Sequence, residues 1–459
     1  MIESTGINRL VYHFFEARIL CGYYTYGENL PPISKICTMF GMAPATVRLA
    51  LAQLEKKKYI QVDARKAPKV IYRALPDEIR KNTAVYLLQR EKGIADMIHT
   101  GSYLFGNLWE AGLRQWDKEA LEQLWTALTN PAQGMVPMPI AFYILALTGL
   151  NNGLITNLYW DIIQYLMFPY LENHDEEEMF PQEISGRSVD DMVAVLHQVF
   201  ARMNEQATDQ VFDFIDTVRK EFPEMEQIPF EWTIYRQRPQ IRYTFVSKLI
   251  REIMSGKYPA GSYLPSLPQM AQQYGVAVST VRRALTMLDS LGFVRSYHGK
   301  GTAVCMHLDH FDCSGKDIRE GMRLYRESLE LLTLTIGPVS QYMLASLSEE
   351  KRTALLNLFD EIHREGKSYL CFERYLVFIH SECPSALIRE CFSRILELLA
   401  WGYPFALEKR KDQNLHLEYD QFVSEAVECL RNNKNAVFSE NWTRLMEEEK
   451  QQFSDEYGI

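Results

Sequence analysis

The sequence of 459 residues lacks a hydrophobic run long enough to cross a membrane. Its most apolar stretch, residues 135–150, is shorter than the roughly 20 residues of a membrane-spanning helix and contains Pro137 and Pro139. We therefore expect a buried helix there and no membrane insertion. The first ten residues also lack a basic segment followed by an apolar one, so we expect no secretion signal and a cytoplasmic location.

Motifs for metal binding and catalysis are missing as well. The eight cysteines form no CxxC pair and have no histidine at zinc spacing, which favours reduced, packed thiols. His363 and His380 are candidate metal ligands by residue type only, and histidines at packed or surface positions are more common. Because the sequence contains no phosphate-binding loop or nucleophile elbow, we predict no cofactor, no metal and no enzymatic activity.

Acidic residues dominate the chain, but they are distributed unevenly. The net charge is −10, with 49 Lys and Arg against 59 Asp and Glu. Residues 1–75 contain 11 basic and 5 acidic residues, residues 236–307 contain 10 and 2, and the remainder contains 28 and 52. Because phosphates attract basic surfaces and repel acidic ones, two basic segments in an acidic chain indicate binding to nucleic acid.

The two basic segments are copies of one another. At the constant offset that takes Gly22 to Gly256, thirteen positions carry the same residue in both copies without a gap, which indicates an internal duplication. The first members of these pairs are Gly22, Tyr24, Gly27, Leu30, Pro31, Gly41, Ala43, Thr46, Val47, Arg48, Ala50, Leu51 and Leu54. A weaker match relates residues 154–170 to residues 387–403, and Pro229 and Pro239 bracket the predicted junction.

The second copy predicts a helix-turn-helix. Residues 242–256 have the apolar spacing of an amphipathic helix, a short second helix within residues 268–275 ends at Gly275, and a third helix begins near Val278. On the third helix one face, formed by Val281, Ala284, Leu285 and Leu288, is apolar, and the other carries Ser279, Thr280, Arg282 and Arg283. The third helix of such a motif can enter the major groove of DNA.

A basic hairpin follows the third helix. Residues 293–304 predict two short strands around the turn His298, Gly299, Lys300 and Gly301, in which the glycines allow positive φ. In the first copy this wing has no glycines but carries Arg65, Lys66 and Lys69. A basic wing can contact the DNA backbone or the minor groove.

Residues 253–304 closely resemble the DNA-binding domain of GntR-type bacterial regulators. The resemblance rests on the turn G-x-Y-x-x-G-x-x-LPS, the recognition helix TVRxAL and the wing HGKGT. Residues 19–72 keep the turn and the TVRxAL core. The resemblance implies that Thr280 and Arg282, and likewise Thr46 and Arg48, lie on the DNA-facing surface of each recognition helix, with His298 and Gly299 as wing contacts. The predicted DNA-binding residues are Thr46, Arg48, Arg65, Lys66, Lys69, Ser279, Thr280, Arg282, Arg283, His298, Gly299 and Lys300.

Both copies depart from the family pattern where bases are read. The family has a hydroxyl residue and an arginine at the start of the recognition helix, and this chain has Ala277-Val278 and Ala43-Pro44 there. The arginine of the preceding helix is replaced by Pro268 and Ser34. Because arginine paired with guanine is the commonest strong base contact, sequence readout is weaker here or different. The alternatives are a solvated helix face for Arg282 and Arg48, and a plain polar turn residue for His298.

The segments that follow the basic copies predict all-α domains. Residues 76–235 and 308–459 carry long amphipathic stretches and little strand signal. Residues 141–166 are similar to the helical effector domain of FadR-type regulators, but Tyr143 and Leu376 stand where that family has a metal-binding histidine. The aromatic residues Tyr159, Trp160, Tyr165, Phe168 and Tyr170 form either a hydrophobic core, the commoner case, or the lining of a ligand pocket.

The predicted fold is mainly α, with two winged helix-turn-helix domains, residues 1–75 and 236–307, alternating with two all-α domains, residues 76–235 and 308–459. The predicted function is a bacterial transcription regulator that binds double-stranded DNA at adjacent half-sites, as a pseudo-symmetric monomer or a homodimer. The helical domains are expected to sense a small-molecule effector or to bind each other. Two alternatives remain, a winged-helix module for protein interaction or weak DNA binding, and an enzyme fused to DNA-binding modules.

Overall fold

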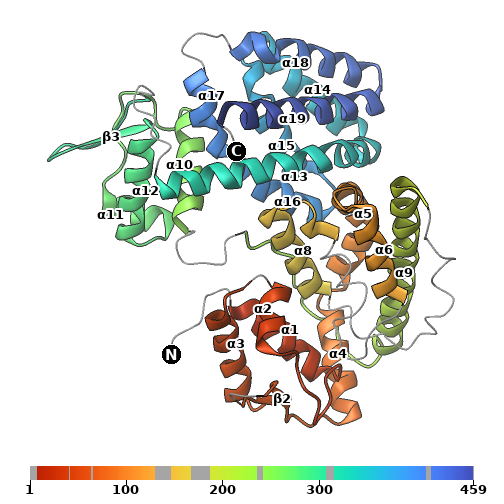
Figure 1. Cartoon of the computed structure of the whole chain (residues 1–459). Helices are drawn as coiled ribbons and strands as arrows, with labels where there is room; N and C mark the ends of the chain where they lie inside the picture. The colour runs from red at the N-terminus through yellow and green to blue at the C-terminus, as the bar shows by residue number, and fades with distance from the viewer. Residues whose placement is uncertain are drawn as a thin grey trace. The chain divides into compact units, whose positions relative to one another are not determined.

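The computed structural model describes residues 8–40, 42–63, 66–129, 146–166, 187–234, 241–306, 315–409 and 415–457. The chain divides into two compact units, Met1–Ser102 with Gly106–Gln237 and Tyr103–Phe105 with Arg238–Ile459. Helices dominate both units, and within the described ranges the strands form two sheets of two strands each, which confirms the predicted mainly α fold (Figure 1). The finer division into four domains stays a prediction.

The first unit begins with a small winged helix-turn-helix. Its elements are α1 (Asn8–Leu20), α2 (Ile33–Phe40), α3 (Pro44–Lys56), β1 (Ile60–Gln61) and β2 (Lys69–Val70). Both α1 and α2 pack against α3, and Phe14, Phe15 and Phe40 form an aromatic core in which the Phe14 and Phe40 rings lie 5.0 Å apart. The sheet is minimal because only Ile60–Val70 and Gln61–Lys69 pair.

The helical part of the first unit contains α4 (Pro76–Leu88), α5 (Glu91–Leu113), α6 (Lys118–Thr129), α8 (Gly153–Leu166) and α9 (Val189–Val218). The aromatic residues of α8 contribute to packing, since Tyr159, Trp160 and Tyr165 are buried and the Trp160 ring stacks on Phe40 with centroids 4.5 Å apart. This stacking joins the winged domain to the helical part. Phe168, Tyr170 and the N-terminal part of the expected buried helix, residues 135–145, lie outside the described residues.

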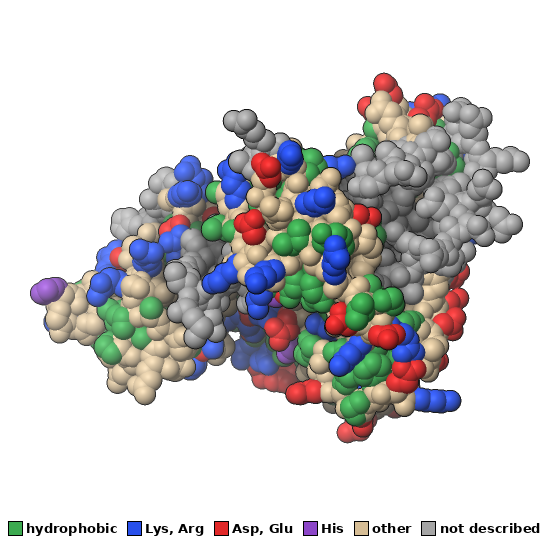
Figure 2. Space-filling model, turned by 90° about the horizontal axis from the view of Figure 1, so that it is seen from below, with side chains coloured by type: hydrophobic (Ala, Val, Ile, Leu, Met, Phe, Trp, Pro, Cys, Tyr) green, Lys and Arg blue, Asp and Glu red, His purple; other side chains and the backbone are tan. Residues whose placement is uncertain are grey.

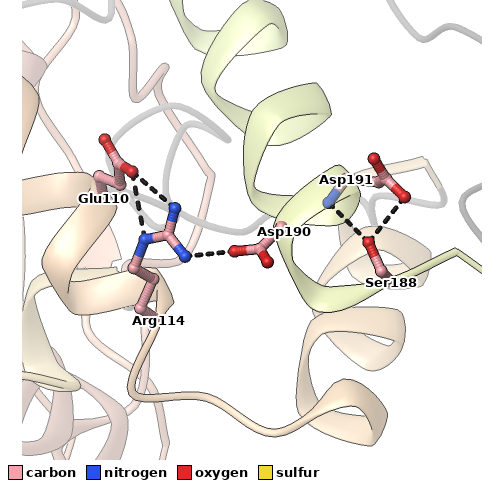
Figure 3. Close-up of polar contacts among 5 residues, drawn as sticks. All are labelled: Glu110, Arg114, Ser188, Asp190 and Asp191. Carbon is pink, nitrogen blue, oxygen red and sulfur yellow. Dashed lines mark hydrogen bonds and ion pairs between the residues drawn. The ribbon is translucent and has the colours of Figure 1, made fainter.

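Polar contacts fix the start of α9. The Ser188 hydroxyl accepts a hydrogen bond from the Asp191 backbone amide at 3.2 Å, which satisfies one of the free amides at the helix N-terminus. Arg114, directly after α5, bridges Glu110 and Asp190, so the end of α5 and the first turn of α9 are held together (Figure 3). An exposed pair of this kind adds little stability, and its effect here is to set the position of α9.

The second unit begins with the second winged helix-turn-helix. It contains α10 (Ile241–Met254), α11 (Leu267–Tyr274), α12 (Val278–Ser290), β3 (Val294–Tyr297) and β4 (Gly301–Val304). The bounds of α2 and α3 become those of α11 and α12 under the same shift that takes Gly22 to Gly256. Likewise α8 becomes α16 (Ala386–Leu399) under the shift that takes Leu154 to Leu387. The helix bounds therefore repeat with the sequence duplication, in the winged and in the helical parts.

The rest of the second unit is a helical bundle. In addition to α16 it contains α13 (Lys316–Ser346), α14 (Glu349–Arg364), η5 (Ser368–Leu370), α15 (Cys371–Glu382), η6 (Ala400–Gly402), α17 (Tyr403–Lys409), α18 (Leu415–Arg431) and α19 (Asn435–Tyr457). The longest helix, α13, packs along α19 (Figure 1). Tyr375 stacks on Trp442 at 4.6 Å in the core. The winged domain joins the bundle through α10, which packs against α16 and η6.

The seven cysteines in the described part of the chain are free thiols, and five of them are buried. Burial raises the pKa of Cys371, so this thiol is neutral and behaves as a packed apolar group. Cys313 lies outside the described residues. Among the described helices, none combines the length and the hydropathy that a membrane crossing requires.

Candidate nucleic-acid interface

The second recognition helix, α12, is oriented by its apolar face. Gly275 ends α11 in the left-handed conformation at φ 65°, and Ala277 begins α12 without a side-chain cap. Val281, Ala284 and Leu288 are fully buried against the winged-domain core. Since these residues fix the rotation of the helix, Ser279, Arg282 and Arg283 are exposed on the opposite face, and Thr280 is half-buried beside them.

The two arginines of α12 are available to a ligand. Neither Arg282 nor Arg283 forms an ion pair with any of the described residues, and both side chains are exposed. Guanidinium groups in this state can pair with phosphate oxygens or with the O6 and N7 atoms of guanine. The geometry is therefore that of a basic helix face open to the solvent.

The second wing is an ordered hairpin. Val294 to Tyr297 pair with Val304 to Gly301, and the Ser296 and Thr302 hydroxyls are hydrogen-bonded at 3.0 Å. Gly299 and Gly301 take φ values of 74° and 102°, which side chains with a Cβ rarely adopt. His298, Gly299 and Lys300 form the exposed turn, and the hairpin projects away from α10, α11 and α12 (Figure 1).

The first strand of this wing, β3, carries two exposed residues that sequence reasoning missed. Arg295 and Tyr297 on β3 are exposed, the latter to 46%. Arg295 adds an exposed positive charge to the wing, between α12 and the turn in the sequence. Counting Lys and Arg in the segment from the helix end to the wing would have identified Arg295 from the sequence.

The first recognition helix, α3, has a different exposed face. Val47, Ala50, Leu51 and Leu54 are buried as their counterparts in α12 are, and Thr46 is half-buried. Arg48 is exposed, but its neighbour Leu49 is a leucine with 60% of its surface exposed. Leu49 is the counterpart of Arg283 in the duplication, so the first copy replaces an exposed arginine with an exposed apolar side chain.

The paired strands of the first wing are two residues long, and backbone contacts attach them to the turn before α2. The Leu30 amide donates to the Pro68 carbonyl at 2.8 Å, and the Val70 amide donates to the Glu28 carbonyl at 2.8 Å. Lys66 and Lys69 are exposed, and Arg65 lies outside the described residues. On the face of the molecule shown in Figure 2, hydrophobic side chains lie among Lys and Arg side chains.

The histidines considered as metal ligands have protein partners. His363 Nδ1 lies 2.9 Å from Asp420 Oδ1, and His380 Nδ1 lies 3.2 Å from the Arg389 carbonyl. Within the described ranges no three His, Cys, Asp or Glu side chains are grouped as a metal site. Leu376, at the position where an effector-domain histidine was considered, is buried, and Tyr143 lies outside the described residues.

Comparisons with known proteins match both winged domains. The family model for bacterial regulatory proteins of the gntR family matches residues 8–70 and again residues 243–304. The fatty acid metabolism regulator protein of Haemophilus influenzae (strain PittGG) is 26% identical over 227 residues, which cover 45% of this chain and 92% of that protein. The HTH-type transcriptional regulator TreR of Bacillus subtilis is 36% identical over 61 residues, 13% of this chain and 26% of that protein. A solved structure of Streptococcus agalactiae GntR, 16% identical, covers 46% of this chain and 99% of that chain with a TM-score of 0.20.

Proposed function

Because this chain is a GntR-type transcription regulator that carries the family's DNA-binding domain twice, we propose that it grips two adjacent half-sites with its two recognition helices. The observation that supports this most directly is the pair of equivalent helices, α3 and α12, each with an exposed arginine, Arg48 or Arg282, beside a half-buried threonine. Arg48 contacts DNA from the first helix and Arg282 from the second. A regulator of this kind acts in the cytoplasm, where bacterial DNA lies.

The two half-sites differ in sequence. On α12, Arg282 and Arg283 offer two guanidinium groups, which suit guanine in the major groove. On α3, the exposed Leu49 offers an apolar surface, which suits the methyl group of thymine. The operator is therefore asymmetric, with guanine contacted by the second reader and thymine by the first.

Phosphate contacts supply most of the affinity. The DNA backbone of one half-site is contacted by the first copy, through Thr46, Arg65, Lys66 and Lys69. The second copy contacts the backbone of the other half-site through Ser279, Thr280, His298, Gly299 and Lys300. Such phosphate contacts account for the basic character of the two segments. Because each neutralised phosphate releases counterions, the logarithm of the binding constant falls with the logarithm of salt at a slope of about −0.9 per contact.

The helical parts sense a small molecule or bind each other. A cavity of about 680 Å³ in the first unit is lined by α1, α4, α8 and residues 228–233. The second unit has a cavity of about 100 Å³ beside α10. Both cavities adjoin the first helix of a winged domain, a position from which a ligand can alter DNA binding. One chain then acts as a pseudo-twofold monomer, and an obligate full-chain dimer in analytical ultracentrifugation would contradict this.

A second candidate function is a winged-helix module for protein interaction, with weak, non-specific DNA binding. It is favoured by the exposed Leu49 and by the absence of an arginine at the start of α3. Genome-wide recovery of fragments bound by the purified protein separates the two. Enrichment of one asymmetric motif, lost in Arg282→Ala, supports sequence-specific regulation, and no enrichment at low salt favours the protein-binding function.

A further inference from the structure

The second wing has an outer face that is formed by three adjacent chain segments. Its strand β4 lies between β3 and the turn before α11, so that Ala303 is opposite both Arg295 and Tyr263, and Gly301 is opposite Tyr297. Directly opposed residues of an antiparallel sheet lie on the same face, and successive residues of a strand alternate between faces. These five positions therefore share one face, which we call the wing strip: Tyr263, Arg295, Tyr297, Gly301 and Ala303.

The wing strip is the solvent face of the sheet. On the opposite face Val294 and Val304 are buried in the winged-domain core, each with 1% of its surface exposed. On the strip Tyr263 is 52% exposed, Tyr297 is 46% exposed, and Arg295 is exposed as well. The core of the winged domain therefore leaves these three large side chains open to a ligand.

The two tyrosine rings flank the smallest residue of the strip. A Cβ atom at Gly301 would lie 3.6 Å from Cδ1 of Tyr263, so this ring lies beside the glycine. Packing of an aromatic ring over a glycine in a sheet stabilises the sheet, but it involves the ring alone. Within the described part of the chain, neither the Tyr263 hydroxyl nor the Tyr297 hydroxyl has a hydrogen-bond partner. Both hydroxyls are available to an acceptor on another molecule.

The charge of the wing strip is positive. Arg295 forms no ion pair with a described residue, and residues 290–306 contain no Asp or Glu. The turn beside the strip adds Lys300 and His298. A surface that combines free hydroxyl donors with an unpaired guanidinium, and that has no acidic side chain of its own, favours an anionic partner.

The wing strip is a property of the second copy alone. The constant offset of the duplication takes its five positions to Asn29, Gln61, Asp63, Ala67 and Lys69 in the first copy. The same cross-strand pairing holds there, because Lys69 is opposite both Gln61 and Asn29. The winged fold therefore forms without the two tyrosines and the arginine.

We propose that the wing strip binds the sugar–phosphate backbone of one strand of duplex DNA. Arg295 pairs with a phosphate, the hydroxyls of Tyr263 and Tyr297 donate to phosphate oxygens, and the two rings pack against deoxyribose. The proposal rests on the proposed function, because it extends the DNA contacts of the second reader beyond its recognition helix and the turn of its wing.

The strip continues the turn of the wing without a break. Tyr297 directly precedes His298, and Gly301 ends the same turn at the start of β4. Because a strand rises about 3.4 Å per residue, Arg295 lies about 7 Å further from the turn than Tyr297. The hairpin projects from α10, α11 and α12, so its outer face is accessible along its length (Figure 1). A DNA strand that meets the turn therefore passes next to the strip.

Fluorescence anisotropy of the full-length protein with a random-sequence duplex, at several salt concentrations, tests the proposal. Arg295→Gln should weaken binding by about tenfold and reduce the magnitude of the salt slope by about 0.9, the value for one phosphate contact. Tyr263→Phe and Tyr297→Phe keep the rings and remove the hydroxyls, and each should weaken binding by about 2- to 10-fold. Urea denaturation of the same variants should match that of the wild type, because the packing on Gly301 is kept.

Two control variants separate the strip from general charge and from the first copy. Lys434→Gln removes one positive charge between α18 and α19, at a side chain that is 50% exposed, and should bind DNA as the wild type does. Gln61→Ala changes the counterpart of Arg295 and should also leave affinity unchanged. If Arg295→Gln has no larger effect than Lys434→Gln, the proposal is overturned.

The phenylalanine variants also separate a backbone contact from base stacking. Aromatic rings bind unpaired bases by stacking, which phenylalanine preserves. If both phenylalanine variants bind the duplex as the wild type does, or if Tyr297→Ala weakens binding to oligothymidine more than binding to the duplex, the backbone assignment is overturned.

Hydroxyl-radical footprinting on the recovered operator distinguishes this proposal from the proposed function. Two protected half-sites, with sugars beside the second half-site exposed again in Tyr297→Ala, support both. Two half-sites with a footprint unchanged in Tyr297→Ala overturn the wing strip and leave the proposed function standing. One protected half-site that loses sugar protection in Tyr297→Ala contradicts the proposed function and supports the wing strip. Failure of the wild type to bind any duplex overturns both.

Discussion

Leu49 and Arg283 occupy equivalent places on the two recognition helices, and exchanging them tests how the two helices divide the operator. In Arg283→Leu the second helix loses an exposed guanidinium, and in Leu49→Arg the first helix gains one. A bidentate arginine–guanine pair contributes about 1–3 kcal/mol of discrimination, so Arg283→Leu should weaken operator binding by about 5- to 150-fold. Because both side chains are exposed, neither substitution should change folding stability by more than about 0.5 kcal/mol.

Fluorescence anisotropy at several salt concentrations identifies what Arg283 contacts. If it reads a base, Arg283→Leu lowers affinity and leaves the salt slope unchanged. If it contacts a phosphate, the slope decreases in magnitude by about 0.9. Selection from random duplexes with Leu49→Arg should replace thymine with guanine in the half-site of the first copy. Recovery of the wild-type motif by both variants would refute the assignment of Leu49 and Arg283 to base readout.

Three further predictions concern the arginines of the two recognition helices, the glycine that ends α11, and an ion pair on α13. Arg282→Ala should weaken operator binding more than Arg48→Ala, because the second copy has an additional exposed arginine and longer paired strands in its wing. Anisotropy titration of both variants measures this. Gly275→Ala should lower the free energy of unfolding by about 1–2 kcal/mol in urea denaturation, because φ is 65° there while the added Cβ meets no atom within 4 Å. The hydrogen bond from Arg323 lowers the pKa of Glu320. The ionised carboxylate should therefore stabilise the fold at any pH above its pKa in the unfolded chain, about 4.3. This contribution should be lost as the pH falls through the lower pKa of Glu320 in the folded protein, which urea denaturation at several pH values measures.

Each of these predictions has a control within the chain. Equal losses for Arg282→Ala and Arg48→Ala would contradict the ranking of the two copies. Gly106→Ala, inside α5 with open space around it and no positive φ, should instead stabilise by up to about 1 kcal/mol. Glu320→Gln should flatten the acid limb of the stability curve, and an unchanged pH dependence would show that the Arg323 contact contributes nothing to it.

The winged domains could be predicted from the sequence because their signals are local. The spacing of Val281, Ala284 and Leu288 determines which face of α12 is buried, and Gly275 ends α11 where a left-handed residue is needed. These signals recur in both copies at a constant offset, so each copy supports the interpretation of the other. The exposure of Leu49 also follows from the duplication, because the constant offset takes Leu49 to Arg283, which lies on the polar face of its recognition helix.

The cavity beside α10 could not be predicted in this way. Its lining combines Arg251 with residues of eight bundle helices, the short η5 and η6 included, and some of these, such as Glu449, are far from it in the sequence. The described aromatic residues on α8 are buried: Trp160 stacks on Phe40 of the winged domain, and Tyr165 also lines the cavity of about 680 Å³. Whether an aromatic side chain lies in a core or lines a pocket depends on tertiary packing. The spacing of such residues along the helix is the same in both cases.

Fusion of two readers into one chain explains how the copies could diverge. In a homodimer every substitution in the recognition helix is present in both subunits. An exposed leucine in place of arginine therefore weakens binding to both half-sites. If this chain binds as we propose, the second reader binds first, and the first reader then meets DNA at an effective concentration of about 1 mM. A non-specific dissociation constant of about 10⁻⁴–10⁻⁶ M is then sufficient for occupancy, and it adds about 10- to 1,000-fold in overall affinity. Under the proposed function, a first wing without glycines and an exposed Leu49 would be tolerable, because the first copy would need only phosphate contacts and a single apolar base contact.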